Sequence, residues 1–441
     1  MIKLSDHFKY STLIRFTLPS VAMMIFTSIY GVVDGVFISN FVGETPFAAV
    51  NFIMPVLMIL GGFGFVFGTG GSALIAKTMG EGDHKRANAQ FSFLICVSAV
   101  LGIILAIPSI LFLPEIAALL GATGEMLDCC VLYGRIVLLA LPAQLLQFAF
   151  QSFFVTAEKP TLGLVMTVSA GVTNMVLDAL FMAVFGWGVV GAAAATAISQ
   201  AVGGIAPLFY FAAKNSSLLR LSHPRVDLRA LWQTCANGSS ELMSSISMSL
   251  VGMLYNVQLM RYAGEQGVSA YGVMMYVNMI FIAIFIGFSV GSAPLVSYHY
   301  GAQNHAELKS LRKKSLVIIG TSSLLMLVAA LALARPLAAI FVGYSPALLD
   351  MTHHGFLIFS FSFLFAGLAI FFSSFFTALN NGLVSALISF LRTLVFQIAA
   401  VLILPLLFDI DGIWLSAVVA ELVAALLSLG FMVGLQKKYQ Y

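Results

Sequence analysis

Four acidic residues lie inside strongly apolar segments of this 441-residue chain: Asp34, Asp178, Glu241 and Glu421. A carboxylate within a membrane is costly unless it is paired, hydrated or protonated, so each is a candidate for binding an ion, a proton or a substrate. The other Asp and Glu residues fall in or beside the polar joints between apolar segments. The chemistry of the chain is therefore expected at these four positions.

Asp34 and Asp178 are expected at the same depth, because each lies near the same end of its own apolar segment. Asn174 precedes Asp178 by one helical turn and shares its helix face, and Thr196 lies at a similar depth in the next segment. Carboxylate, amide and hydroxyl oxygens suit a small hard cation such as Na⁺. Two neighbouring carboxylates can equally share a proton. The set predicts a cation or proton site.

Glu241, Tyr255 and Arg392 are further candidates for binding a substrate or a proton, because each places a polar group within an apolar segment. Glu421 has a structural alternative, since it can pair with Arg392 of the neighbouring segment. The aspartate pair has one too, because a buried Asp can cap a kinked helix or pair with Arg. Both interpretations stay open at this point.

Pro19 lies in the same apolar segment as Asp34. Proline removes a backbone hydrogen bond and bends a helix. The segment is therefore a candidate for bending and straightening with the charge state of Asp34. A static kink is the alternative.

The segments that must position these residues are apolar enough to cross a membrane. The chain is 60% hydrophobic and 9% charged, whereas soluble domains are about 25% charged. A membrane helix needs about 20 mostly apolar residues, and such stretches recur along the chain. They predict an all-α polytopic membrane protein with spans at 14–39, 47–75, 91–112, 129–154, 161–185, 188–213, 230–260, 268–297, 315–334, 352–379, 383–408 and 412–434.

Basic residues orient these spans, because short cytoplasmic loops accumulate Lys and Arg. All of the 21 Lys and Arg residues fall at alternate joints except Arg135, Arg261, Arg335 and Arg392. The pattern predicts that both termini are cytoplasmic and that the protein lies in the cell (inner) membrane. The net charge of +3 follows from the same rule, so it gives no sign of nucleic-acid binding.

An internal repeat divides the chain into two halves. The segment after Gly43 aligns with the segment after Gly264, and His84 aligns with His305 at the same spacing. Each half would hold six spans that enter the membrane the same way up, related by a pseudo-two-fold axis along the membrane normal. The predicted domains are an amino-terminal lobe at 1–213, a cytoplasmic linker at 214–229 and a carboxy-terminal lobe at 230–441.

The repeat also indicates an asymmetry of function between the lobes. It places Tyr255 opposite Asp34 and Ala400 opposite Asp178, so the carboxylate pair exists in one lobe only. A purely structural role would not obviously be confined to half of a two-fold architecture. This favours an ion or proton site in the amino-terminal lobe.

With these residues in view, the chain resembles the multidrug and toxic compound extrusion (MATE) family over essentially its full length. The similarity is carried by VDGVFISNFVG from Val33, GTGGSALIAKTMGEGDHKRA from Gly68, GVVGAAAAT from Gly188 and FFTALNNG from Phe375. Within that resemblance, four residues match the amino-lobe cation or proton site of the prokaryotic branch, and a fifth matches its bending proline. These are Asp34, Asn174, Asp178, Thr196 and Pro19.

The resemblance implies a V-shaped protein of twelve transmembrane helices in two six-helix lobes. It would exchange inward-moving Na⁺ or H⁺ for small organic, often cationic, compounds moving outward, with no covalent cofactor and as a monomer in the lipid bilayer. Another branch of the family carries coupling carboxylates in the second lobe. Glu241 fits that pattern only in part, because the tenth span has no acid.

Three other functions fit the sequence less well. A flippase for lipid-linked precursors would line its interior with cations, yet only Arg135 and Arg392 are intramembrane, against four acids. A membrane-embedded enzyme would need a His/Asp/Glu metal set or a Ser/Lys pair at membrane depth, and neither is visible, so no catalytic residues are predicted. A channel is disfavoured, because two unlike lobes give no symmetric ring of filter residues.

Overall fold

A computed structural model describes residues 2–343 and 345–441, and every regular element in them is a helix. The first half contains α1 (Tyr10–Phe41), α2 (Glu44–Phe65), the π-helix η1 (Val66–Gly70), α3 (Gly71–Gly80), α4 (His84–Leu111), α5 (Leu113–Leu120), α6 (Gly124–Leu139), α7 (Leu141–Thr156), α8 (Pro160–Asp178), the π-helix η2 (Ala179–Val184) and α9 (Gly188–Ala212). The second half contains α10 (Leu228–Gly301), α11 (His305–Val342), α12 (Pro346–Phe359), α13 (Ser362–Ala378), α14 (Gly382–Phe390), the π-helix η3 (Leu391–Val395), α15 (Phe396–Ile403), α16 (Pro405–Gly434) and α17 (Gln436–Tyr439).

The described residues contain the twelve passes that the apolar segments predict. Nine helices are long and apolar enough to span a membrane, and two bent pairs raise the number to 11: α6 with α7 at 60°, and α12 with α13 at 48°. The 74-residue α10 contains a non-helical residue, Gly264, with φ 64° and ψ −156°. Because Gly264 turns the chain back, α10 supplies two spans. The fold class is confirmed as all-α and polytopic.

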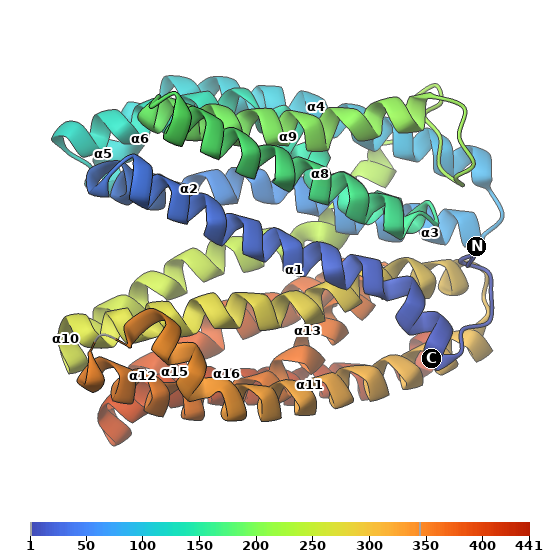
Figure 1. The fold of residues 1–441 in the computed structure, drawn as a ribbon. Coiled ribbons are helices and arrows are strands. Elements are labelled where there is room, and N and C mark those ends of the chain that lie inside the picture. The colour runs from blue at the N-terminus through green and yellow to red at the C-terminus, as the bar shows by residue number, and fades with distance from the viewer. Residues whose placement is uncertain (1, 344) are drawn as a thin grey trace.

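The helices form two bundles that follow the two halves of the sequence. Figure 1 shows α1 to α9 above and α10 to α16 below, with α1 beside the lower bundle. Both termini lie at the same end of the molecule, which we call the terminal end; the opposite end is the distal end (Figure 1). α10 begins at the terminal end, turns at the distal end and returns.

The sequence repeat reappears in the backbone. Gly43 and its repeat partner Gly264 both take positive φ, at 121° and 64°, a conformation that glycine adopts without steric cost. Asp83 and its partner Asn304 both cap a helix, and each side chain accepts a hydrogen bond from the backbone N–H three residues on. The two halves therefore turn and restart their helices at equivalent positions.

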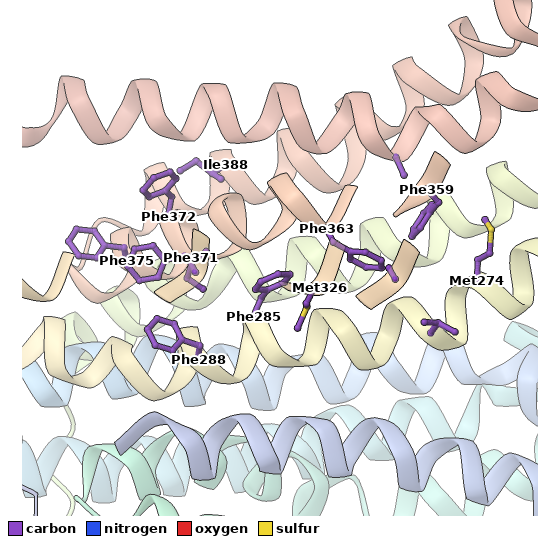
Figure 2. Packing of buried hydrophobic residues seen from close by; sticks show 14 of the residues in the cluster. Met274, Phe285, Phe288, Met326, Phe359, Phe363, Phe371, Phe372, Phe375 and Ile388 are labelled. Carbon is purple, nitrogen blue, oxygen red and sulfur yellow. The ribbon is translucent and has the colours of Figure 1, made fainter. Parts of the chain in front are cut away.

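Aromatic side chains fill the core of the second bundle. Figure 2 shows Phe285 and Phe288 of α10 facing phenylalanines of α13, with Met326 of α11 packed beside them. The Phe288 and Phe371 ring centroids lie 6.3 Å apart, within the range of favourable aromatic pairs. Lipid cannot drive these helices together by a hydrophobic effect, so close packing of this kind holds them.

The two bundles meet through glycines at the terminal end. A Cβ on Gly80 would lie 2.0 Å from the Tyr298 carbonyl oxygen, and a Cβ on Gly301 would lie 2.1 Å from the Lys77 carbonyl oxygen. The two contacts are repeat-related, because Gly80 corresponds to Gly301 and Lys77 to Tyr298. α3 and the end of α10 thus cross symmetrically, and neither glycine leaves room for a side chain.

A second glycine crossing joins α1 to the returning part of α10. A Cβ on Gly287 would lie 2.5 Å from the Val21 Cα, and a Cβ on Gly291 would lie 3.1 Å from the Thr17 Cα. Thr17 and Val21 belong to the half of α1 nearest the terminal end. Small residues allow such close backbone approach between membrane helices.

The segment before α1 also connects the bundles. The Leu4 N–H donates to the Glu158 carboxylate at 2.6 Å, in the joint between α7 and α8 of the first bundle. The Phe8 N–H donates to the Glu307 carboxylate at 2.9 Å, at the start of α11 in the second bundle, and His7 pairs with the same carboxylate. Leu4 and Phe8 are fully buried. The segment spans the terminal end as a strap.

Candidate cation site in the first bundle

A close contact between α1 and α8 sets the position of the aspartates. A Cβ on Gly171 would lie 2.4 Å from the Phe26 ring and 3.2 Å from the Tyr30 ring. Both helices run in the same direction, and Asp34 and Asp178 each follow this contact by about two turns. The two carboxylates therefore reach the same level on facing helix surfaces, as the sequence predicts.

The aspartates face each other in a buried environment. Asp34 is 8% exposed and Asp178 is 0% exposed, and the carboxyl groups are close enough to hydrogen-bond when one of them is protonated. Neither takes part in an ion pair among residues 2–343 and 345–441. Two buried carboxylates this close are not both stable as bare anions. The pair therefore requires a proton or a cation.

Asn174 and Thr196 complete the predicted set. Within the described part of the chain, the Asn174 Oδ1, the Thr196 Oγ1, both Asp178 oxygens and the Asp34 Oδ1 are buried without a hydrogen-bond partner. Buried hydrogen-bond acceptors normally have a partner. A cluster of unpaired acceptors therefore fits a bound species that donates hydrogen bonds or is coordinated by oxygen atoms. A small cation and a hydrated proton both meet that requirement.

Two tyrosines that are absent from the predicted set also lie at the site. Tyr30 lies close to Asp34, and Tyr133 of α6 lies beside Asp34 and next to the Thr196 hydroxyl. Tyr133 is fully buried. Tyr30 precedes Asp34 by one helical turn, which is a usable sequence signal. Tyr133 has no such signal, because it comes from a distant segment.

The local backbone changes immediately after Asp178. α8 ends there and continues as η2, the π-helix from Ala179 to Val184. A π segment widens the helix and recurs at functional sites. On the other side of the site, α1 runs unbroken through Pro19, so the bending role of that proline stays a prediction.

The candidates of the second bundle lie apart from the aspartate pair. The Arg392 guanidinium binds the Glu421 carboxylate in two parallel hydrogen bonds of 2.8 and 2.9 Å, which is the pairing the sequence allows. The Tyr255 hydroxyl donates to the Gln397 side-chain oxygen at 2.8 Å, and its ring stacks on Tyr271. At the position equivalent to Asp34, the second bundle thus has a hydrogen-bonded tyrosine.

Glu241 lies on the first part of α10, half-buried. Its neighbour Leu242 and Ser245, one turn further on, contact Gly62 of α2 in the first bundle. Glu241 therefore lies beside the contact between bundles and outside the aspartate site.

No group of three or more His, Cys, Asp or Glu side chains that could hold a metal ion is found in the part of the chain that the structure describes.

Twelve helical passes in two repeated bundles, with a carboxylate pair lacking a protein countercharge, define a membrane transporter. A family model described as MatE matches residues 19–180 and 242–403. These two stretches make up most of the chain, one in each half. The chain belongs to the MATE family.

Proteins of similar sequence support this assignment. The chain is 26% identical over 436 residues to "Multidrug export protein MepA" of Staphylococcus haemolyticus, covering 97% of this chain and 94% of that protein. It is 27% identical over 425 residues to the protein of the same name from Staphylococcus saprophyticus, covering 95% and 92%. Both likenesses cover nearly the full length of the chain.

Solved structures show the same fold. "Crystal structure of MATE in complex with MaL6" matches with a TM-score of 0.92 at 22% identity, covering 98% of this chain and 97% of that one. A second structure, "Reverse polarity of binding pocket suggests different function of a MOP superfamily transporter from Pyrococcus furiosus Vc1 (DSM3638)", matches with a TM-score of 0.91 at 21% identity, covering 99% of this chain and 98% of that one. The similarity covers both bundles.

Proposed function

We propose that the protein is an antiporter that exports small organic, often cationic, compounds in exchange for Na⁺ or H⁺. The observation that carries the proposal is the Asp34–Asp178 pair, which is buried in one bundle without a cation of the protein beside it. Such a pair needs an ion to enter it and is destabilised when the ion leaves. The names of the staphylococcal relatives support the export of drugs.

The disposition of the arginines favours cationic cargo over the anionic headgroup of a lipid-linked precursor. Arg392 is already neutralised by Glu421. Arg135 is exposed and donates to the Ile110 carbonyl oxygen. Arg392 is therefore not free to bind an anionic headgroup, and Arg135 is held against the backbone of α4. A flippase remains the second candidate, because the same two-lobed fold can serve more than one transport function.

The orientation follows from the charge pattern. We propose that the terminal end is cytoplasmic and that the protein is a monomer in the cell (inner) membrane, with lobes at 1–213 and 230–441 and a linker at 214–229. The irregular backbone from Ala213 to Asp227 is consistent with that linker. The glycine crossings at the terminal end then make this the state that is closed toward the cytoplasm.

The mechanism follows from these two proposals. Na⁺ or H⁺ from outside neutralises Asp34 and Asp178 and thereby removes the cost of bringing the carboxylates together. The shift between outward and inward states is driven by the difference in ion affinity between them. α1 transmits the change, because it carries Asp34 and also packs on α10 through Thr17 and Val21. Pro19 is the point at which α1 would bend.

Cargo is tested with the purified protein in liposomes. A fluorescent organic cation and a fluorescent lipid-linked analogue are offered separately, with a Na⁺ or a proton gradient imposed in turn. Gradient-driven movement of the organic cation supports the exporter. Movement of the lipid analogue alone would replace it with the flippase.

A further inference from the structure

Two helices of the site continue a polar face toward the terminal end. On α8, Thr167 lies two turns before Asn174 on the same side of the helix. On α9, Gln200 lies one turn after Thr196 and continues its face. Thr167 and Gln200 are buried. Polar side chains thus extend the cation site into the interior of the first bundle.

A small cavity lies along this face between α7, α8 and α9. It is lined by Gln147, Gln151, Met166, Thr167 and Gly203, among others. The space open to the centre of a water-sized molecule is about 10 Å³, close to the minimum for one ordered water. Gly203 lies close to the Gln147 side chain, since a Cβ on it would lie 2.6 Å from the Gln147 carboxamide carbon.

Among the polar side chains that line the cavity, Gln151 lacks hydrogen-bond partners, and Gln200 on the adjoining polar face of α9 does too. Gln151 is only 4% exposed, and both its carboxamide oxygen and nitrogen are without a hydrogen-bond partner in the described chain. The Gln200 side-chain oxygen is likewise buried and unpaired. Such groups are normally satisfied by protein or by buried water. A guest that both donates and accepts hydrogen bonds fits the Gln151 carboxamide.

The cavity lies on the direct line from the site to the terminal end. Thr167 is seven residues from Asn174 and seven from the start of α8 at Pro160, so it lies about 10 Å of helix axis from each. The neutral side-chain oxygens at the cavity can bind water, pass a proton through that water, or coordinate a Na⁺ ion. They carry no charge that would hold a cation permanently.

We propose that this cavity holds a water molecule and is the step through which the coupling ion passes from Asp34 and Asp178 to the cytoplasm. The passage of the ion rests on the proposed antiport, whereas the hydration of the cavity does not. A release route inside the first bundle lets the ion leave while cargo occupies the space between bundles.

Hydration is tested by radiolytic hydroxyl labelling, with Met166 as the reporter at the cavity and Met274, which is fully buried in the second bundle, as the internal reference. Met166 is half-buried and is expected to be oxidised faster than Met274 in any case, so hydration is judged from the change in the Met166 rate that a cavity variant produces. Gln151→Leu replaces the unpaired carboxamide with apolar carbon, which removes the partners of a bound water, and is expected to lower the Met166 rate by about threefold or more. Thr173→Val, a half-buried position of α8 that does not line the cavity, is the matched control and leaves the rate unchanged.

The passage is tested by transport in the same variants. Gln151→Leu and Thr167→Val are expected to lower gradient-driven efflux, Gln151→Leu by about tenfold, with little change in the ion concentration for half-maximal rate. Thr173→Val transports like wild type. If Gln151→Leu elutes as a folded, monodisperse protein and transports normally, the proposal that the ion passes through this cavity is wrong. A Met166 oxidation rate that is the same in Gln151→Leu as in wild type would overturn the hydration of the cavity. That result is independent of whether either gradient drives transport.

Discussion

At the scale of single residues, the main feature of the site is that its buried oxygens have no positively charged partner from the protein. Asp34, Asn174, Asp178 and Thr196 bring buried oxygens together and supply no positive charge. The sequence pointed to the two aspartates because a carboxylate within an apolar segment is costly, and to Asn174 and Thr196 through helix spacing and depth. Tyr133 and Gln151 could not be found in that way, because tyrosine and glutamine are tolerated in membrane helices and only the fold shows what they face.

Removing one carboxylate should stabilise the protein while disabling the site. Asp178→Asn relieves the repulsion within the pair, so the unfolding midpoint in Na⁺-free detergent at neutral pH is expected to rise by about 2 °C or more. Asp350→Asn, an exposed position, is the control and leaves the midpoint unchanged. A lower midpoint in Asp178→Asn would mean that Asp178 makes a structural bond instead.

Arg392 and Glu421 should behave as a structural ion pair. Arg392→Met leaves the Glu421 side chain, which is 10% exposed, without its countercharge, and is expected to cost about 3 kcal/mol of stability. The double variant Arg392→Met with Glu421→Leu is expected to recover most of that loss. Thermal unfolding of the three proteins measures this, and a double variant as unstable as the single one would refute the pairing argument.

At the scale of elements, the number and order of the spans could be predicted, but their bends and exact ends could not. The predicted span at 129–154 is the bent pair α6 and α7, which changes direction near Pro142. The predicted end at 75 is short of Gly80, because η1 and α3 continue the second span. The short helix α5 was not predicted, since its eight residues are too few to cross a membrane.

The strap before α1 should respond to pH through Glu158. Burial raises the pKa of the Glu158 carboxyl above its usual value, although the Leu4 N–H and Lys3 oppose the shift. A raised pKa means that the docked strap is most stable below the usual Glu range of about 4.3 and loosens as pH rises through the higher value. Hydrogen exchange of the Leu4 amide, corrected for its intrinsic pH dependence, is expected to lose protection over that interval.

Glu158→Gln is the matched control for the strap. The glutamine retains a carbonyl oxygen for the Leu4 N–H and has no proton to lose. The pH dependence of Leu4 protection should therefore disappear, while the Phe8 amide, which is held by Glu307, stays protected. A pH response that persists in Glu158→Gln would assign it to another group.

At the scale of the whole molecule, the repeat gives two bundles the same framework and different chemistry. Gly43 and Gly264 turn the chain at equivalent points, whereas Asp34 is replaced by Tyr255 bonded to Gln397. The repeat could be predicted because glycines at turns and crossings tolerate few substitutes. The symmetric crossing of Gly80 and Gly301 could not, because contact between the bundles leaves no periodic signal in either half.

That crossing should control closure of the terminal end. Gly301→Leu places a side chain against the Lys77 carbonyl oxygen, where even a Cβ would lie at 2.1 Å. Transport is expected to fall by about tenfold or more, and a cysteine introduced at Lys77 should become more reactive from the terminal side. Gly430→Leu is the control, because a Cβ there meets nothing within 4 Å. Normal transport in Gly301→Leu would exclude the crossing as a gate.

The most direct test of the whole account is efflux of a fluorescent organic cation from proteoliposomes containing wild type, Asp34→Asn or Asp178→Asn, with Na⁺ and proton gradients imposed separately. Wild type is expected to be driven by at least one gradient, and that response should be lost in both variants although each remains folded. Gradient-driven efflux that survives in both variants would contradict the assignment of the coupling ion to this carboxylate pair.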